Sequence, residues 1–473
     1  MDAFLGVDVG TTQTKVVALA EDGRRQVARA PTPVGRDAGG PVHDPDAIVT
    51  LVGELARTAL RALDGCRVRA VCTASVGEEG VAIGADGRPL YPALAWYARR
   101  ASATGERFRR EHDPAATYAT CGLPQDPIHT LFHWAWLHDH APEVLRAART
   151  WLSLSEYVAY ALSGARAMSP SQASRTHLWS PFGDGWQEEW ARAVGGDAAV
   201  LPPVVPAGAV LGPLRPDALP GVAAAPDAAV VMGGHDHSMG AWMAGVRSPG
   251  EVLDSLGTAE SVYVIASPGV KPTEAGRAAA LQHGVAVSAG PTGRHHVLGA
   301  LHSGAGTAAM VRLLGGDIEA LEQEAETVPP GAGGLRYEPP PWGEDPRGTF
   351  VGVPLEATAG EWFRAVLEGW ARAAVRAVAA VAAEGQSAVR RVRAIGGGSR
   401  VALALVIRAS MLPCPLEVVT EPELVALGAA TMAMGAVRPD LPPPDLAVAP
   451  VLPHPAWARA YRSGGHERPA EGA

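Results

Sequence analysis

The stretch Phe-Leu-Gly-Val-Asp-Val-Gly-Thr-Thr-Gln-Thr-Lys, residues 4–15, decides the fold of this chain, because it predicts a β-hairpin whose turn suits phosphate binding. Apolar residues dominate both sides of the turn, as expected for two buried strands. At the turn, Gly10, Thr11 and Thr12 offer backbone N–H groups and hydroxyls, the donors that surround phosphate oxygens in such turns. The spacing alone fits an ordinary hairpin with polar turn residues equally well.

Two charged side chains flank this turn. Asp8 lies near the end of the first strand, where a carboxylate can hold a metal ion or its bound water, and Lys15 supplies a positive charge nearby. The chain has only two lysines, Lys15 and Lys271, so its basic positions are nearly all arginine. A lysine at this place therefore favours the phosphate-binding interpretation.

The turn matches neither a Walker loop, which needs Gly-x-x-x-x-Gly-Lys-Ser/Thr before a helix, nor a Rossmann Gly-x-Gly-x-x-Gly. It resembles the first phosphate loop, Asp-x-Gly-Thr-Ser/Thr-x-x-Lys/Arg, of the superfamily that contains actin, hexokinase and the heat-shock chaperones. Proteins of that superfamily have two similar halves that face each other across a nucleotide cleft. The resemblance therefore predicts a second hairpin farther along the chain.

Length and composition indicate a globular protein of two large domains, with 473 residues of which 47% are hydrophobic and 19% charged. A net charge of -9 argues against a nucleic-acid partner, which would need a basic surface. No apolar run reaches the roughly 20 residues that span a bilayer, and no signal-peptide pattern opens the chain, so we expect no membrane association. The four cysteines lack metal or redox spacing, which favours reduced thiols in the cytoplasm.

The apolar periodicity predicts the elements that carry the remaining motifs. We expect helices over 44–63, 151–162, 238–246, 308–314, 362–383 and 424–434, and strands over 68–73 and 228–232.

Polar residues that suit sugar recognition follow the strand over 68–73. Glu78 and Glu79 are adjacent carboxylates, which accept hydrogen bonds from hydroxyl groups. An exposed acidic turn explains them as well, and on this evidence alone it is the favoured interpretation. Farther on, Trp96 offers a face for a sugar ring and Arg100 offers N–H donors, although the start of an amphipathic helix accounts for both nearly as well.

The segment Gly-Gly-His-Asp-His, residues 233–237, joins a predicted strand to a predicted helix. A carboxylate at such a junction, near the positive end of a helix, is well placed for a general base, so Asp236 is the catalytic candidate. His235 and His237 could instead form a metal site with it. Adjacent side chains point in different directions, so we rank metal binding below catalysis by Asp236.

The second hairpin is found at residues 251–265. Apolar strands are expected over 251–256 and 261–265, with Gly257 and Thr258 at the turn, so that Ser-Leu-Gly-Thr-Ala stands where the first half has Asp-Val-Gly-Thr-Thr. This weak internal repeat supports a two-lobed nucleotide cleft. Another turn, residues 396–399, reads Gly-Gly-Gly-Ser after an apolar strand and would let the backbone lie against a nucleoside.

Taken together, the motifs resemble the FGGY family of carbohydrate kinases from residue 4 to about residue 435. The order and spacing of the motifs carry this resemblance: 8–12, 96–100, 130–137 with Pro142, 233–236, 257–258, 348–352, 364–369 and 396–399. It implies an α/β fold of two ribonuclease H-like (actin-like ATPase) domains with an interdomain cleft. The expected domains are 1–246, with the sugar site and catalytic base, and 247–440, with the nucleotide site, followed by a Pro/Ala/Gly-rich tail over 441–473.

The resemblance also implies a reaction and a role for each motif. The activity would be transfer of the ATP γ-phosphate to a hydroxyl of a sugar, ketose, polyol or sugar acid, with Asp236 as the base and Asp8 holding Mg²⁺ through water. Phosphate and nucleotide contacts would come from Gly10, Thr11, Thr12, Lys15, Gly257, Thr258, Gly304, Gly397, Gly398 and Ser399. Substrate contacts would come from Glu78, Glu79, Trp96, Arg100, His235 and Asp236.

Several positions depart from the family pattern. Ala98 replaces a carboxylate common after the tryptophan, His133 replaces the usual lysine, and Ala259 replaces a common serine. These departures affect the expected substrate more than the phosphate machinery. The alternatives are a catalytically silent sugar- and nucleotide-binding relative and an ATPase scaffold of the same superfamily. A homodimer is common in such kinases.

Overall fold

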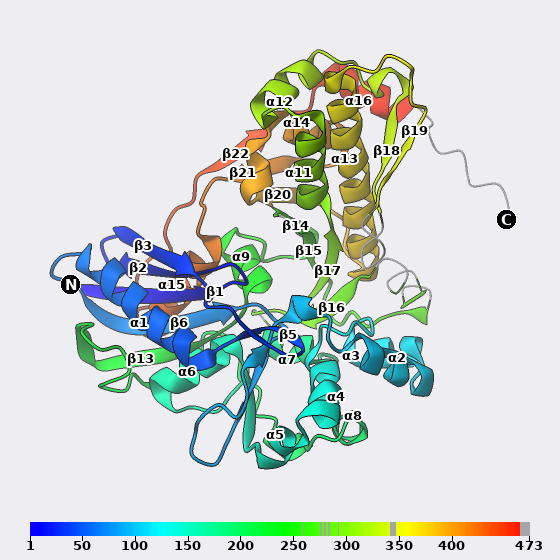
Figure 1. Cartoon of the computed structure of the whole chain (residues 1–473). Helices are drawn as coiled ribbons and strands as arrows, with labels where there is room; N and C mark the ends of the chain where they lie inside the picture. The colour runs from blue at the N-terminus through cyan, green and yellow to red at the C-terminus, as the bar shows by residue number, and fades with distance from the viewer. Residues whose placement is uncertain are drawn as a thin grey trace.

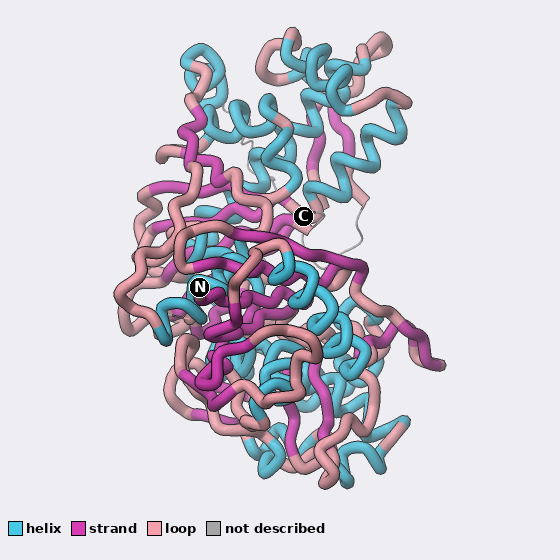
Figure 2. The backbone as a smooth tube through the Cα atoms, turned by 90° about the vertical axis from the view of Figure 1, so that its left-hand side faces the viewer, coloured by secondary structure: helices cyan, strands magenta, loops and turns pink. Residues whose placement is uncertain are grey.

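The computed structural model describes residues 1–257, 259–274, 277–278, 281, 284–291, 293–340 and 347–463. The chain forms two lobes, each built on its own β-sheet (Figure 1). Viewed from the side, the lobes lie one above the other, and strands run through the interior of both (Figure 2). The arrangement is the two-domain α/β architecture expected from the sequence.

The N-terminal lobe is built on a six-stranded sheet with the order β12-β13-β6-β1-β2-β3. Its strands are β1 (Asp2–Val9), β2 (Gln13–Ala20), β3 (Arg25–Pro31), β6 (Arg67–Ser75), β12 (Val210–Pro213) and β13 (Ala224–His235). The hairpin β1–β2 pairs antiparallel, with Asp8 opposite Lys15, whereas β6 runs parallel to both β1 and β13. The predicted first hairpin is thus confirmed.

Helices cover both faces of this sheet because its side chains alternate between two apolar clusters. Leu5, Val7 and Val9 point into the cluster shared with α1 (Pro45–Arg61) and α6 (Leu154–Ser163). Phe4 points to the opposite face, toward α9 (Asp236–Met243) and α15 (Leu424–Val437). Helix α1 begins where predicted, because the carboxylate of Asp44 accepts hydrogen bonds from the first-turn N–H groups.

Helix α15 belongs by sequence to the second domain but packs on the N-terminal sheet, against β1 and β6. Gly6 allows this contact: a Cβ atom there would lie 1.9 Å from the carbonyl oxygen of Ala426. The lobe is therefore assembled from both ends of the chain.

The C-terminal lobe has a seven-stranded sheet with the order β16-β17-β15-β14-β20-β21-β22. The strands are β14 (Glu251–Leu256), β15 (Glu260–Ile265), β16 (Ala286–Ala289), β17 (His295–Leu301), β20 (Arg391–Ile395), β21 (Leu416–Val419) and β22 (Val448–Val451). The helices are α11 (Ser303–Leu314), α12 (Ile318–Glu326), α13 (Ala359–Glu384), α14 (Ala402–Met411) and α16 (Pro455–Ser463). Strand β22 and helix α16 lie within the stretch expected as a tail, whose last ten residues fall outside the described ones.

A helical subdomain completes the N-terminal lobe beside the sheet (Figure 1). It contains α2 (Ser102–Glu111), α3 (Pro114–Cys121), α4 (Thr130–His140), α5 (Pro142–Ala147), α7 (Pro170–Ala173) and α8 (Glu188–Ala193). It also contacts the other lobe, because the N–H groups of Val287 and Ala289 donate to the carbonyl of Gly122 and the hydroxyl of Ser174.

Two element boundaries were predicted wrongly. The expected helix over 151–162 is a strand, β9 (Thr150–Ser153), followed by α6, because β9 pairs with β7 (Gly80–Ile83) far away in the sequence. The helix expected from Ala308 begins at Ser303. Tertiary strand pairing and a tolerated Gly-rich first turn override the local patterns in these two places.

Candidate active site

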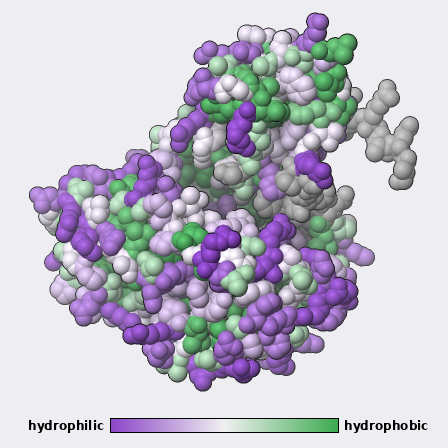
Figure 3. Space-filling model, viewed as in Figure 1, coloured by the Kyte–Doolittle hydropathy of each residue, from purple (hydrophilic) through white to green (hydrophobic). Residues whose placement is uncertain are grey.

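A cavity of about 200 Å³ lies between the two lobes, where the surface is hollowed in the space-filling view (Figure 3). Both lobes line it. The N-terminal lobe contributes Thr11, Val76, Gly77, Glu78, Trp96, Pro124, Asp126, Ile128, His129, Arg175, His235, Asp236 and His237, and the C-terminal lobe contributes Ala259, Ser261, Gly284, Ala286, Leu298, Gly299 and Ala300.

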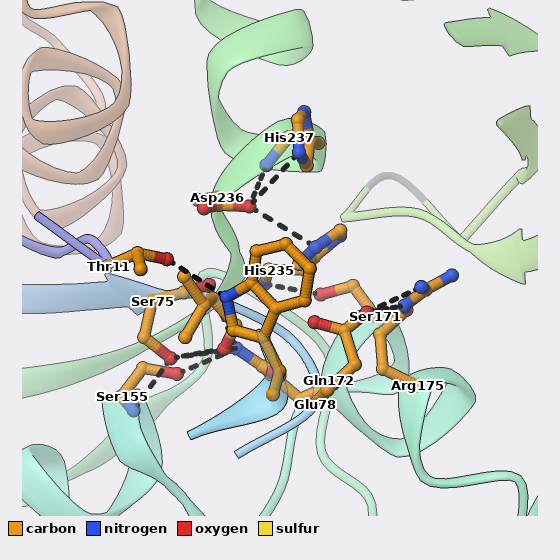
Figure 4. Close-up of polar contacts among 12 residues, drawn as sticks. Thr11, Ser75, Glu78, Ser155, Ser171, Gln172, Arg175, His235, Asp236 and His237 are labelled. Atoms are coloured by element: carbon orange, nitrogen blue, oxygen red, sulfur yellow. Dashed lines mark hydrogen bonds and ion pairs between the residues drawn. The ribbon is translucent and has the colours of Figure 1, made fainter. Parts of the chain in front are cut away.

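Asp236 is placed in this cavity by the junction of β13 and α9. Strand β13 ends at His235 and α9 begins at Asp236, so the carboxylate lies at the N-terminal end of the helix. Its Oδ1 accepts the backbone N–H of His237 at 2.6 Å and lies 3.2 Å from Nε2 of His235 (Figure 4). Burial raises the pKa of Asp236. Both contacts fall on Oδ1, which leaves Oδ2 as the oxygen available to a substrate hydroxyl.

The two neighbouring histidines offer ligand atoms close to this carboxylate. One atom each from His235, Asp236 and His237 lie within 4.8 Å of one another. His235 is buried, and burial holds its pKa well below the ordinary value, so its ring is neutral and its Nε2 can donate to Asp236. Imidazole nitrogens are ligands for zinc-like ions rather than for Mg²⁺, which prefers oxygen.

Asp8 provides the oxygen donor that suits Mg²⁺. It is 6% exposed, and burial raises its pKa to about 7 against the opposing effect of Lys15. The carboxylates of Asp236 and Glu423 raise the pKa of Asp8 further. Lys15 lies 3.8 Å from Asp8 and 3.0 Å from Glu423, and Arg29 lies 3.4 Å from Glu423, so Glu423 has two cationic partners. Among the described residues, Asp8 has its one charged partner 3.8 Å away, so its carboxylate could take a divalent cation.

Hydrogen bonds on two sides fix the turn of the first hairpin beside the cavity. The hydroxyl of Thr32 donates to the carbonyl of Gly10 at 2.7 Å, and the N–H of Thr32 donates to the carbonyl of Thr12 at 3.0 Å. Thr12 is exposed, whereas the hydroxyl of Thr11 accepts the indole N–H of Trp96 at 3.0 Å. The turn is therefore fixed by β3 on one side and by Trp96 on the other.

The second hairpin, β14–β15, is present where the repeat predicts it. Gly257 donates its N–H to Ser255, whereas the predicted phosphate contact Thr258 lies outside the described residues. Below the turn, the buried guanidinium of Arg408 contacts Asp254 and Glu260. Burial raises the pKa of Asp254 to about 7.

The adjacent carboxylates Glu78 and Glu79 have different surroundings. Both are buried, at 7% and 1% exposure, so the alternative of an exposed acidic turn is wrong. Glu78 faces the cavity, and its Oε1 accepts both Nε and Nη2 of Arg175. Glu79 points away and contacts His43 and the backbone N–H of Trp96.

Trp96 and Arg100 also lie in different surroundings. Trp96 lines the cavity in a short 3₁₀ turn, η1 (Trp96–Ala98). Arg100 donates to Asp37 and to the carbonyl of Pro41, both at 2.8 Å, and stacks over the ring of Trp136. Arg100 is thus engaged behind the cavity wall and is not one of the described lining residues.

The expected nucleoside residues lie in the C-terminal lobe, apart from this cavity lining. Gly304 is in the first turn of α11. Gly397, Gly398 and Ser399 form η5 (Gly397–Arg400), directly after β20. A Cβ atom on Gly398 would lie 2.9 Å from Cβ of Leu256, so η5 sits against the second hairpin.

The sequence reasoning missed the part of the site formed by residues 169–176. In this segment Ser171 accepts the N–H of His235 at 3.0 Å, and Gln172 donates to the hydroxyls of Ser75 and Ser155 (Figure 4). Arg175 comes from the same segment. The signal was an unusually polar run between two structured segments, but nothing local identified its partners.

Comparisons with known proteins agree with the two-lobed fold. Family models described as the N-terminal and C-terminal domains of the FGGY family of carbohydrate kinases match residues 3–242 and 297–437. An L-fuculokinase of Salmonella typhi is 27% identical over 91% of each chain, and a xylulose kinase of Streptomyces rubiginosus is 30% identical over 91% of this chain and 87% of its own. The structure of a xylulose kinase from Rhodospirillum rubrum superposes with a TM-score of 0.87 at 25% identity, covering 97% of this chain and 96% of that one.

Proposed function

Since the chain belongs to the FGGY family of carbohydrate kinases, and is thus an ATP-dependent kinase of a sugar or polyol, we propose that Asp236 is its general base. The position of this carboxylate carries the proposal: it lies at the start of α9, lines the cavity between the lobes and keeps Oδ2 unengaged by its histidine neighbours. From there it would accept the proton of the substrate hydroxyl as that oxygen attacks the γ-phosphorus. Positioning and electrostatics dominate such phosphoryl transfers.

The charges of the cavity favour a neutral substrate. Arg175 is the one arginine among the described lining residues, and Glu78 already neutralises it. Asp126 and Asp236 add negative charge. A sugar acid would bring a carboxylate to a site with no unpaired arginine, whereas a ketose or polyol would offer hydroxyls to Oε2 of Glu78 and a face to Trp96. The named activities of the fuculose and xylulose relatives are consistent with this class.

The phosphate side would be built from the two hairpins. Gly10, Thr11 and Thr12 of the first hairpin and Gly257 of the second would donate to phosphate oxygens, and Lys15 would add a positive charge. Mg²⁺ would be held by Asp8, directly or through water, and would neutralise charge on the phosphates when bound. The glycines of η5 and α11 are proposed to accommodate the nucleoside.

One experiment tests the base and the substrate class together. We expect Mg-ATP turnover with a neutral ketose or polyol in a panel that also contains aldoses, deoxysugars and sugar acids. Asp236→Ala should lower kcat about 10²–10⁴-fold, the scale for a positioned acid or base. Asp139→Ala is the matched control, because it removes an exposed carboxylate outside the described cavity lining, and it should retain kcat. Full activity of Asp236→Ala would exclude it as the base.

The environment and assembly of the enzyme follow as further proposals. All four cysteines are unpaired, which supports a reducing compartment such as the cytoplasm. In the described part of the chain, none of the helices combines the length and apolarity needed to cross a bilayer. A homodimer is proposed from the family alone.

A further inference from the structure

Three hydrogen bonds link four residues beside the cavity. Nδ1 of His43, on β5 (Gly40–His43), lies 2.6 Å from Oε2 of Glu79. Oε1 of the same carboxylate accepts the backbone N–H of Trp96 at 3.2 Å. The indole Nε1 of Trp96 then donates to the hydroxyl of Thr11 at 3.0 Å. The chain thus leads from the buried wall of the N-terminal lobe to the turn of the first hairpin.

Glu79 is fully engaged in this chain. The side chain of Glu79 is 0% exposed and that of His43 is 1% exposed, and each carboxylate oxygen has one partner. Burial raises the pKa of Glu79, and the hydrogen bond from His43 opposes that effect. A carboxylate in such surroundings cannot turn toward a sugar without leaving a buried partner unsatisfied. Any effect of Glu79 on substrate binding must therefore pass through Trp96.

The direction of the last bond follows from the chemistry of its two groups. An indole N–H only donates, so the hydroxyl of Thr11 is the acceptor. Because that hydroxyl accepts from Trp96, its own hydrogen is left for another acceptor. Thr11 lies at the turn proposed to bind phosphate, and phosphate oxygens are acceptors. The indole therefore orients the hydroxyl as a phosphate donor.

We propose that the chain His43–Glu79–Trp96–Thr11 couples sugar binding to phosphate binding. This inference rests on the proposed function, in which Trp96 lines the sugar pocket and Thr11 contacts phosphate. A sugar packed on Trp96 limits the motion of the indole and so orders the hydroxyl of Thr11. A phosphate bound at Thr11 orders Trp96 in turn, so each ligand tightens the binding of the other.

The test is a double-mutant cycle on the full-length enzyme, read by calorimetry without turnover. Sugar affinity is measured with and without a non-hydrolysable ATP analogue and Mg²⁺, and the ratio of the two affinities is the synergy. Trp96→Phe keeps an aromatic face but loses the N–H, and Thr11→Val loses the hydroxyl at nearly constant shape. Each should reduce the synergy about two- to tenfold, the scale of one neutral hydrogen bond, and the double variant should reduce it no further. If the double variant reduces the synergy by the product of the two single effects, the coupling is overturned.

Two controls separate this inference from the function on which it rests. Gln13→Ala changes an exposed side chain of the same turn that has no proposed role in binding, and it should leave the synergy at the wild-type value. Glu79→Gln keeps an acceptor for Trp96 and should retain more synergy than Glu79→Leu. If wild type binds sugar and analogue without any synergy, the coupling is wrong although the kinase assignment stands. If wild type binds neither ligand, the proposed site itself fails, and the coupling fails with it.

Discussion

Replacing Arg175 by methionine should destabilise the N-terminal lobe by a predictable amount. The guanidinium gives two N–H donors to one oxygen of Glu78, and each residue is 7% exposed. Methionine fills much of the same volume but leaves the carboxylate buried without a cation. Breaking a buried pair in this way costs about 3–5 kcal/mol. At roughly 2–4 °C per kcal/mol, the lobe should melt about 6–20 °C lower.

The assay is thermal unfolding of matched variants at one pH. Adding Glu78→Gln to Arg175→Met removes the unpaired negative charge of Glu78. The double variant should therefore recover most of the lost stability while remaining poor in catalysis. Arg107→Met removes an exposed pair with Asp139 and should change the free energy of unfolding by less than about 1 kcal/mol. The reasoning is refuted if Arg175→Met melts like wild type, or if the double variant is no more stable than the single one.

Two further predictions concern stability. Gly6→Ala should destabilise the protein by about 1–3 kcal/mol or more in chemical denaturation, because its Cβ would meet backbone atoms of α15. A loss below about 1 kcal/mol would contradict that packing. Asp254 should make stability fall as pH rises. Burial raises its folded pKa from 3.8 to about 7, so the folded protein binds this proton more tightly than the unfolded chain, and stability is lost as pH rises through this range. Asp254→Asn should flatten that slope in denaturation curves across this range, and an unchanged slope would show that Asp254 does not titrate there.

The sequence was most informative where the contacts are local. Both hairpins are predictable, because the alternation of apolar residues and the Gly-Thr turn lie within twenty residues in each case. The junction that carries Asp236 is predictable for the same reason. Each of these motifs lies within one short segment and so can be recognised there, although β1 and β13 also pair with the distant strand β6.

The features of the fold and the site that the sequence did not predict depend on contacts between distant segments. Arg175 is 97 residues from Glu78, and nothing near either residue indicates the other. The crossing of α15 to the first sheet rests on Gly6, whose importance appears only when Ala426 is seen against it. Strand β9 was predicted as helix because its partner, β7, comes from another part of the chain. Pairing and close packing of this kind leave no periodic signal.

The surroundings of Arg100, behind the cavity, are compatible with the departures at Ala98 and His133. Without a carboxylate at Ala98, Arg100 finds its partner in Asp37, 63 residues earlier, which also accepts the hydroxyl of Tyr91. His133 is 2% exposed, and burial lowers its pKa to about 3, so it stays neutral where a lysine would bring a second buried cation beside Arg100. The loss of one acid and one base thus leaves the local charge balanced. None of these side chains is a described lining residue, whereas Glu78, Trp96 and Asp236 are. The two departures therefore lie in the support of the pocket, outside its proposed chemical groups.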